Sequence, residues 1–217
     1  MQAKAETYEQ LVDSGVVAVL RGADSETLIG ITDALLEGGV TAIELTADTP
    51  GIEGMLGELT GSFGDDEITV GTGTVLDAET ARMTMLAGAE FVVSPSLHED
   101  VIEICNRYGT LVAPGVMTPT EAIQGYEMGA DLVKIFPASS LGPGHLSSIK
   151  GPYSQIPLMP TGGVDLDNAA DYIEAGAACV GAGGALVDYE AAARGEFETI
   201  TEQARAFSEI IEAAREN

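Results

Sequence analysis

Short runs of β-branched and apolar residues alternate with longer amphipathic, acid-rich stretches along the whole chain. We expect strands at residues 16–20, 42–46, 68–71, 91–94, 111–113, 132–136, 158–160 and 179–181, with helices between them. Strands that alternate with helices form βαβ crossovers in a parallel sheet. Eight such units predict an α/β fold, a closed (β/α)8 TIM barrel, as one domain over residues 1–217. Residues 3–14 are expected to add an N-terminal helix, and residues 195–215 a long closing helix.

The charge balance is extremely acidic. Asp and Glu number 35 against 9 Lys and Arg, so the formal net charge is −26. The acids are scattered along the expected helices and do not form a tail, which indicates a heavily hydrated surface. Nucleic acid and anionic membranes are therefore poor partners. We interpret the charge as adaptation to a salt-rich cytoplasm, as in a halophile.

Cysteine and histidine are too sparse to suggest a metal or a disulfide framework. Cys105 and Cys179 are far apart and lack a CxxC spacing, and His98 and His145 share no ligand pattern. We expect no metal and no cofactor. The N-terminal residues have no hydrophobic signal region, and no apolar run approaches the roughly 20 residues of a membrane span. These features predict a cytoplasmic protein.

Lys134 lies inside an apolar run, residues 131–138, where a surface charge has no obvious role. Burial of an ammonium disfavours its charged form, and the neutral amine is the nucleophile that forms a Schiff base. The alternative is a lysine at the end of a strand that reaches water or pairs with a carboxylate. The segment by itself leaves both interpretations open.

A second ionisable residue is expected to face the same interior. The two-residue period of a strand places Glu44 on one face with Thr46, and Lys134 on one face with Phe136. The intervening aliphatic residues suit the helix layer, so Glu44 and Lys134 are predicted to converge inside the barrel mouth. A buried ion pair without chemistry remains the alternative.

Glycine-rich loops follow the seventh and eighth expected strands, at residues 160–164 and 181–185. Barrel enzymes frequently bind phosphate on these two loops, where glycine lets the backbone N–H groups approach an anion. Either loop alone is a weak signal, because glycine also makes tight turns. Together they favour a phosphorylated ligand.

Two further polar groups are expected at the same rim. Arg21 ends the first strand and offers a fork of donors to a substrate carboxylate, or else forms a structural pair with a neighbouring acid. Thr72 and Thr74 follow the third strand, where their hydroxyls can hydrogen-bond a small keto acid, although a simple turn is the default interpretation.

These motifs together resemble one family, the class I 2-keto-3-deoxy-6-phosphogluconate (KDPG) aldolases, also called 2-dehydro-3-deoxy-phosphogluconate aldolases. The resemblance covers almost the entire chain in order. Its motifs are VAVLRG at 17–22, AIELT at 42–46, GTGTVL at 71–76, VSPS at 93–96, APGV at 113–116, VKIFPA at 133–138, PTGG at 160–163 and GAGG at 181–184.

The resemblance implies a (β/α)8 barrel that assembles as a homotrimer and needs no metal. It implies that Lys134 is the Schiff-base lysine and Glu44 the general acid/base. It also implies that a phosphorylated keto-acid sugar is bound by a set of further residues: Thr74, Phe136, Thr161, Gly162, Gly163, Gly183 and Gly184.

The sequence departs from the family pattern at two positions. Many members carry an arginine for the pyruvate carboxylate four residues after the glutamate, where this chain has Asp48. Relatives that act on the galactonate analogue keep an arginine where Arg21 stands, so Arg21 is predicted to bind the carboxylate. Gly184 occupies a position where many members have a phosphate-binding serine, so an unphosphorylated substrate is conceivable.

The expected reaction is cleavage of KDPG to pyruvate and D-glyceraldehyde 3-phosphate in an Entner–Doudoroff-type pathway. The alternative substrates are 2-keto-3-deoxy-6-phosphogalactonate and 4-hydroxy-2-oxoglutarate. A phosphate-binding barrel isomerase or epimerase would share the glycine loops without an imine. A non-enzymatic binding or regulatory barrel would keep only the phosphate site.

Thermal stability is expected to rise with salt concentration, because screening relieves the self-repulsion of so many like charges. Melting temperatures in molar and millimolar salt check this expectation. Equal melting temperatures would contradict the halophilic interpretation.

Overall fold

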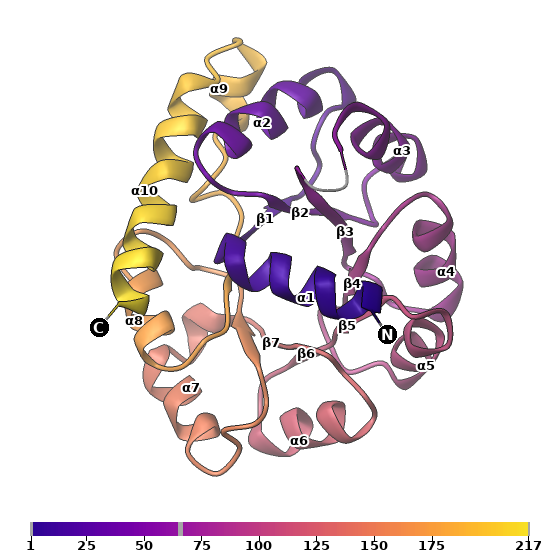
Figure 1. Ribbon diagram of the computed structural model, residues 1–217, viewed down its shortest axis with the longest axis vertical. Coiled ribbons are helices and arrows are strands. Elements are labelled where there is room, and N and C mark those ends of the chain that lie inside the picture. The colour runs from indigo at the N-terminus through magenta and orange to yellow at the C-terminus, as the bar shows by residue number, and fades with distance from the viewer. Residues whose placement is uncertain (1, 65–66, 217) are drawn as a thin grey trace.

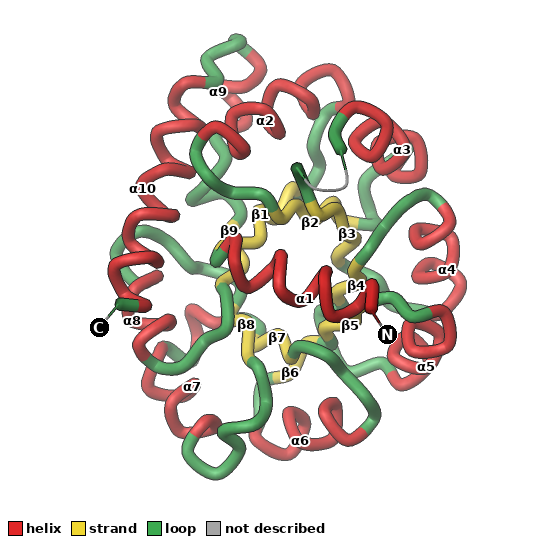
Figure 2. The backbone as a smooth tube through the Cα atoms, in the orientation of Figure 1, coloured by secondary structure: helices red, strands yellow, loops and turns green. Residues whose placement is uncertain are grey.

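The computed structural model describes residues 2–64 and 67–216. Parallel strands form a ring, and helices surround the ring on its outside (Figures 1 and 2). The predicted (β/α)8 barrel is therefore confirmed. The strands are β1 (Val16–Leu20), β2 (Ala42–Thr46), β3 (Thr69–Gly73), β4 (Phe91–Val93), β5 (Leu111–Ala113), β6 (Gly115–Val116), β7 (Val133–Ile135), β8 (Leu158–Pro160) and β9 (Val180–Ala182).

Helices connect the strands in the expected order. They are α2 (Ser25–Glu37), α3 (Ile52–Ser62), α4 (Ala78–Leu86), α5 (Glu99–Tyr108), α6 (Pro119–Glu127), α7 (Pro143–Lys150), α8 (Ala169–Glu174), α9 (Tyr189–Ala193) and α10 (Glu198–Arg215), with a 3-10 turn at Ala138–Ser140. The predicted closing helix at 195–215 begins three residues later, at Glu198, because Gly195 has a left-handed φ of 75° and ends α9. Side-chain caps start several helices: Asp24 accepts from the Glu26 amide and Asp77 from the Thr80 amide.

The fifth predicted strand, 111–113, matches β5, and proline separates it from a short additional strand, β6. β5 and β6 flank Pro114, which has no amide N–H and so interrupts the ladder. The six-stranded sheet β5-β4-β3-β2-β1-β9 consequently ends at β5, and a three-stranded sheet β6-β7-β8 begins after it. On the other side an isolated bridge between Thr161 and Gly181 joins β8 to β9 and closes the ring.

Four strands differ from the prediction at their ends, and one of them, β4, ends at Val93 instead of the predicted residue 94. β3 extends to Gly73, because Gly73 pairs with Thr46 at the end of β2. β7 is shorter than the predicted 132–136, and β9 is shifted one residue beyond the predicted 179–181. The sequence pattern marks apolar runs, whereas pairing with the neighbouring strand sets where each strand ends.

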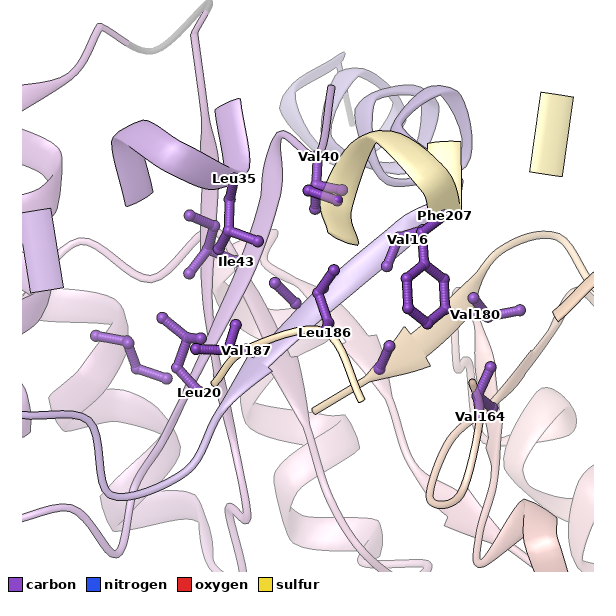
Figure 3. Close-up of a cluster of buried hydrophobic side chains, with 14 of the residues drawn as sticks. Val16, Leu20, Leu35, Val40, Ile43, Val164, Val180, Leu186, Val187 and Phe207 are labelled. Carbon is purple, nitrogen blue, oxygen red and sulfur yellow. The ribbon is translucent and has the colours of Figure 1, made fainter. Parts of the chain in front are cut away.

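One face of each strand packs against the helix layer. Val16 and Leu20 of β1 and Ile43 of β2 are buried beside Leu35 of α2 and Phe207 of α10 (Figure 3). These residues occupy alternate positions, as the two-residue period requires. The helix-facing side of the barrel is thus entirely apolar in this region, which leaves the other face of the strands for the interior.

The helix α1 (Gln2–Ser14) closes one end of the barrel. It lies across the ring of strands in Figure 2, and Leu11 packs with interior residues such as Val17 and Phe91. The Lys4 ammonium donates to Asp131, which lies just before β7. The helix therefore covers the N-terminal ends of the strands and leaves their C-terminal ends as the accessible mouth.

Within the described part of the chain, no helix combines the length and apolar character needed to cross a lipid bilayer.

Candidate functional site

The predicted site residues lie at the C-terminal ends of neighbouring strands. They follow or belong to β1, β2, β3, β7, β8 and β9, and comprise Arg21, Glu44, Thr74, Lys134, Phe136, Thr161, Gly162, Gly163, Gly183 and Gly184. This is the end of the barrel opposite to α1, and it is where barrel enzymes carry their active sites. The fold thus brings together residues that are more than a hundred positions apart.

Glu44 is a carboxyl group buried in the barrel interior, with 1% of its surface exposed. It pairs with Val19 on β1 and Gly71 on β3, and its Oε2 atom has no hydrogen-bond partner among residues 2–64 and 67–216. Burial raises the pKa of Glu44, and the positive charges of Lys134 and Arg21 partly counteract that effect. A carboxyl group with a raised pKa is suited to accept and return protons near neutral pH.

Lys134 is also buried, with 5% of its surface exposed. β7 holds it between Gly115 of β6 and Met159 of β8. Its ammonium nitrogen lies 5.0 Å from the centre of the Phe136 ring, in a cation–π contact. The apolar strand therefore carries the Lys134 side chain into the barrel interior.

Glu44 and Lys134 interact without touching. The Lys134 charge acts on the Glu44 carboxyl, yet none of the ion pairs within 4.0 Å among the described residues joins the two groups. The alternative of a directly bonded buried pair does not describe this arrangement. The amine and the carboxyl group therefore share the barrel interior without an ion pair between them.

Glycines on adjacent strands make room for two of the site side chains. A Cβ atom at Gly73 would lie 1.6 Å from Glu44 Oε1, and a Cβ atom at Gly181 would lie 2.4 Å from Thr161 Oγ1. Neither Gly73 nor the space-making role of Gly181 was predicted. The sequence contains the information needed to predict the role of Gly73, because the two-residue period of β3 places Gly73 on the interior face beside β2.

The two glycine loops differ in why they contain glycine. Gly162 and Gly163 have left-handed φ angles of 89° and 80°. Cβ atoms there would lie 3.0 Å from the Phe136 ring and 2.5 Å from Ser139 Cβ. At Gly184 a Cβ atom would meet nothing within 4 Å. The first loop therefore requires glycine for its conformation, whereas Gly184 in the second loop faces open space.

Arg21 forms a bridge between three strand ends. Its Nη1 donates to Asp48 Oδ2 at 2.8 Å, and its Nη2 donates to Thr74 Oγ1 at 2.9 Å. The side chains of Arg21 and Asp48 remain 60% and 53% exposed. The pair with a neighbouring acid, which the sequence left as an alternative, is thus present, and it lies at the same rim as the other site residues.

Of the two threonines near the end of β3, Thr72 and Thr74, only Thr74 reaches this rim. Thr74 contacts Arg21, whereas Thr72 is fully buried and its Oγ1 has no partner in the described part of the chain. Thr72 alternates with Gly71 and Gly73, which face the interior, so its hydroxyl points to the helix side of β3. The expectation that both hydroxyls serve one ligand is wrong for Thr72.

No group of three or more His, Cys, Asp or Glu side chains in ranges 2–64 and 67–216 is arranged to hold a metal ion. The thiols of Cys105 and Cys179 are free and buried. The mouth brings together the amine of Lys134, the carboxyl group of Glu44 and the guanidinium of Arg21, which is paired with Asp48.

Gly73→Ala is expected to destabilise the protein by about 1–3 kcal/mol, because the added methyl group overlaps the Glu44 carboxyl. Urea denaturation measures the loss. The same substitution in a Glu44→Ala background should cost much less, since the overlapping group is absent. Equal costs in the two backgrounds would contradict the close contact between Gly73 and Glu44.

Glu44→Gln is expected to gain stability relative to the wild type as the pH rises above 4.5, the ordinary pKa of glutamate. The folded state holds the Glu44 proton more tightly than the unfolded chain does, so the wild type loses this contribution as the pH rises through the raised pKa. Melting temperatures of both proteins over a pH series measure the difference. A difference that stays constant with pH would argue against the raised pKa.

Comparison with known proteins agrees with this geometry. The sequence model of the KDPG and KHG aldolase family matches residues 8–203. The chain is 34% identical to the 2-dehydro-3-deoxy-6-phosphogalactonate aldolase of Escherichia coli over 77% of this chain and 81% of that protein. It is 36% identical to the 2-dehydro-3-deoxy-phosphogluconate aldolase of Pseudomonas aeruginosa over 73% of this chain and 70% of that protein.

A solved structure shows the kind of chemistry that the family performs. The KDPG aldolase of Legionella pneumophila, with pyruvate captured as a covalent carbinolamine intermediate, superposes with a TM-score of 0.86 at 30% identity over 93% of this chain and 97% of that one. A carbinolamine forms when an amine adds to a ketone. The fold, the buried amine and these similarities together show that the chain belongs to the KDPG and KHG aldolase family of class I aldolases.

Proposed function

We propose that the protein cleaves KDPG reversibly to pyruvate and D-glyceraldehyde 3-phosphate in an Entner–Doudoroff-type pathway of sugar breakdown. The observation that carries the proposal is the pairing of a buried amine with a buried carboxyl group inside the barrel mouth, without direct contact between them. An imine-forming aldolase requires one nucleophile and one acid/base in a water-poor interior.

Lys134 is the proposed nucleophile. Its neutral amine attacks the C2 ketone of the substrate and forms a carbinolamine. Glu44 shuttles protons as the carbinolamine loses water and becomes a protonated imine. The positive imine nitrogen then draws the electron pair of the C3–C4 bond when that bond breaks.

Glu44 is the proposed acid/base in the cleavage step. It takes the proton of the C4 hydroxyl, directly or through one water, so that the C4 carbon leaves as an aldehyde. The electron pair of the C3–C4 bond forms an enamine, and Glu44 returns a proton to the enamine carbon. Addition of water to the imine releases pyruvate and restores Lys134.

Substrate binding is assigned to the rim of the mouth. Arg21 and Thr74 are proposed to hold the carboxylate and keto group of the pyruvate half, and Thr161 and Phe136 to line the same pocket. Phosphate is proposed to bind the backbone N–H groups of the two loops, Gly162 with Gly163 and Gly183 with Gly184. Neutral backbone donors suit an anion in a chain with a net charge of −26.

The galactonate epimer and 4-hydroxy-2-oxoglutarate are the alternative substrates. The relatives described above include both gluconate and galactonate aldolases, at similar identity. Gly184 has no hydroxyl for the phosphate, so an unphosphorylated substrate gains some support from the open space beside it. Rates with the two C4-epimeric phosphosugars and with 4-hydroxy-2-oxoglutarate, compared under one set of conditions, decide between them.

The proposal includes a cytoplasmic location in a salt-rich cell and assembly as a homotrimer. The large apolar side chains of Leu86 and Tyr108 are 71% and 52% exposed in the single chain and are candidates for burial between copies. Light scattering at high salt measures the assembly.

Borohydride reduction with pyruvate is expected to leave a stable adduct on Lys134. Reduction converts the imine to an amine that survives digestion, and mass spectrometry then locates it. The chain provides its own controls, since Lys4 and Lys150 are its other lysines and should stay unmodified. The absence of an adduct would favour a phosphate-binding isomerase, epimerase or binding barrel, and an adduct on another lysine would reassign the nucleophile.

A further inference from the structure

We propose that Asp48 is a positioning residue that, together with Thr74, fixes the Arg21 guanidinium as the receptor for the carboxylate of the keto acid. This inference rests on the proposed function, because it concerns how the pyruvate half is bound. Asp48 itself is not proposed to touch the substrate.

The contacts of Arg21 hold it from two sides. Asp48, which follows β2, accepts from Nη1, and Thr74, which follows β3, accepts from Nη2. Arg21 itself follows β1, so the guanidinium lies across the ends of three adjacent strands. A long side chain at a half-exposed position normally samples several rotamers, and two acceptors on different strands restrict it to one geometry.

Thr74 is held in an unusual backbone conformation. It is the one non-glycine residue with a positive φ in the described ranges, at 58°. The left-handed region is unfavourable for a β-branched residue, and such outliers persist where the surrounding structure determines them. Here the outlier coincides with the hydroxyl that accepts from Arg21, so the backbone of this loop and the guanidinium fix each other.

The guanidinium retains donors for a ligand. Arginine carries more N–H groups than the two used by Asp48 and Thr74, and the Arg21 guanidinium makes no other hydrogen bond among the residues described. A carboxylate binds such a planar fork through two parallel hydrogen bonds. Burial raises the pKa of Glu44, and the charges of Lys134 and Arg21 counteract this rise. The positive charge of Arg21 therefore reaches the Glu44 carboxyl group even though Arg21 is paired with Asp48.

A second effect of Asp48 acts in the opposite direction and weakens the binding of pyruvate. A carboxylate beside Arg21 also competes with the substrate carboxylate for the same cation. Exposed ion pairs are weak, so competition by Asp48 is modest, whereas the orientation of the fork decides whether two hydrogen bonds to a ligand form at once. The two effects predict opposite changes in pyruvate affinity when Asp48 is removed.

The experiment measures the pyruvate concentration that gives half-maximal borohydride trapping. Asp48→Ala should raise this concentration by about two- to fivefold, the range that an exposed ion pair allows, while trapping at saturating pyruvate stays complete. Asp48→Asn keeps an acceptor oxygen without the charge and should recover most of the affinity. Arg21→Ala should raise the concentration at least as much, and the Arg21→Ala/Asp48→Ala double variant no further.

The chain offers a matched control. Arg194 and Glu196 form another ion pair with side chains 55% and 56% exposed, on the segment between α9 and α10 and not at a strand end. Glu196→Ala should therefore leave pyruvate trapping unchanged. Melting temperatures of all variants identify any that are poorly folded, and for those the double-variant comparison is made at a temperature where both are folded.

Three outcomes would overturn the inference. An unchanged half-maximal concentration in Asp48→Ala would make the pair merely structural, and a lower one would make Asp48 a competitor. Additive effects in the double variant would separate Asp48 from Arg21. Failure of the wild type to trap pyruvate would instead overturn the proposed function, so the two failures are distinguishable.

Discussion

Burial of a carboxyl group in the barrel interior is the constraint on which the mouth of this protein depends. Removing Glu44 from water is unfavourable for its charged form, and the surrounding structure is arranged around that cost. Gly73 gives the carboxyl group space, and two cations act on it from other strands. A water-exposed glutamate would need neither the space nor the neighbouring charges, so both follow from the burial of Glu44.

The order of strands and helices was predictable because it depends on local patterns. Period-two alternation also predicted correctly that Glu44 and Lys134 face the interior, since parity along a strand does not depend on what packs against it. The break between β5 and β6 at Pro114 could have been predicted, because proline has no N–H to donate to a neighbouring strand. Strand ends were less predictable, since the neighbouring strand sets them.

The contacts at the rim could not be predicted in the same way. Asp48 was noted in the sequence as the absence of an arginine, and only the structure shows it bonded to Arg21. Thr72 and Thr74 looked equivalent, but the positive φ of Thr74 separates them. These features depend on loops after the strands, where no periodicity applies and the backbone conformation is set by tertiary contacts.

The division of the barrel into two sheets places the two buried ionisable groups on different sheets. Lys134 belongs to the small sheet β6-β7-β8, whereas Glu44 belongs to the large one, and the sheets meet at Pro114 and at the Thr161–Gly181 bridge. The separation of the amine and the carboxyl group therefore depends on how the two sheets are placed relative to each other, and not on the pairing of one pair of strands alone. The bridge that closes the ring includes Thr161, so a ligand that contacts this residue also contacts the junction between the two sheets.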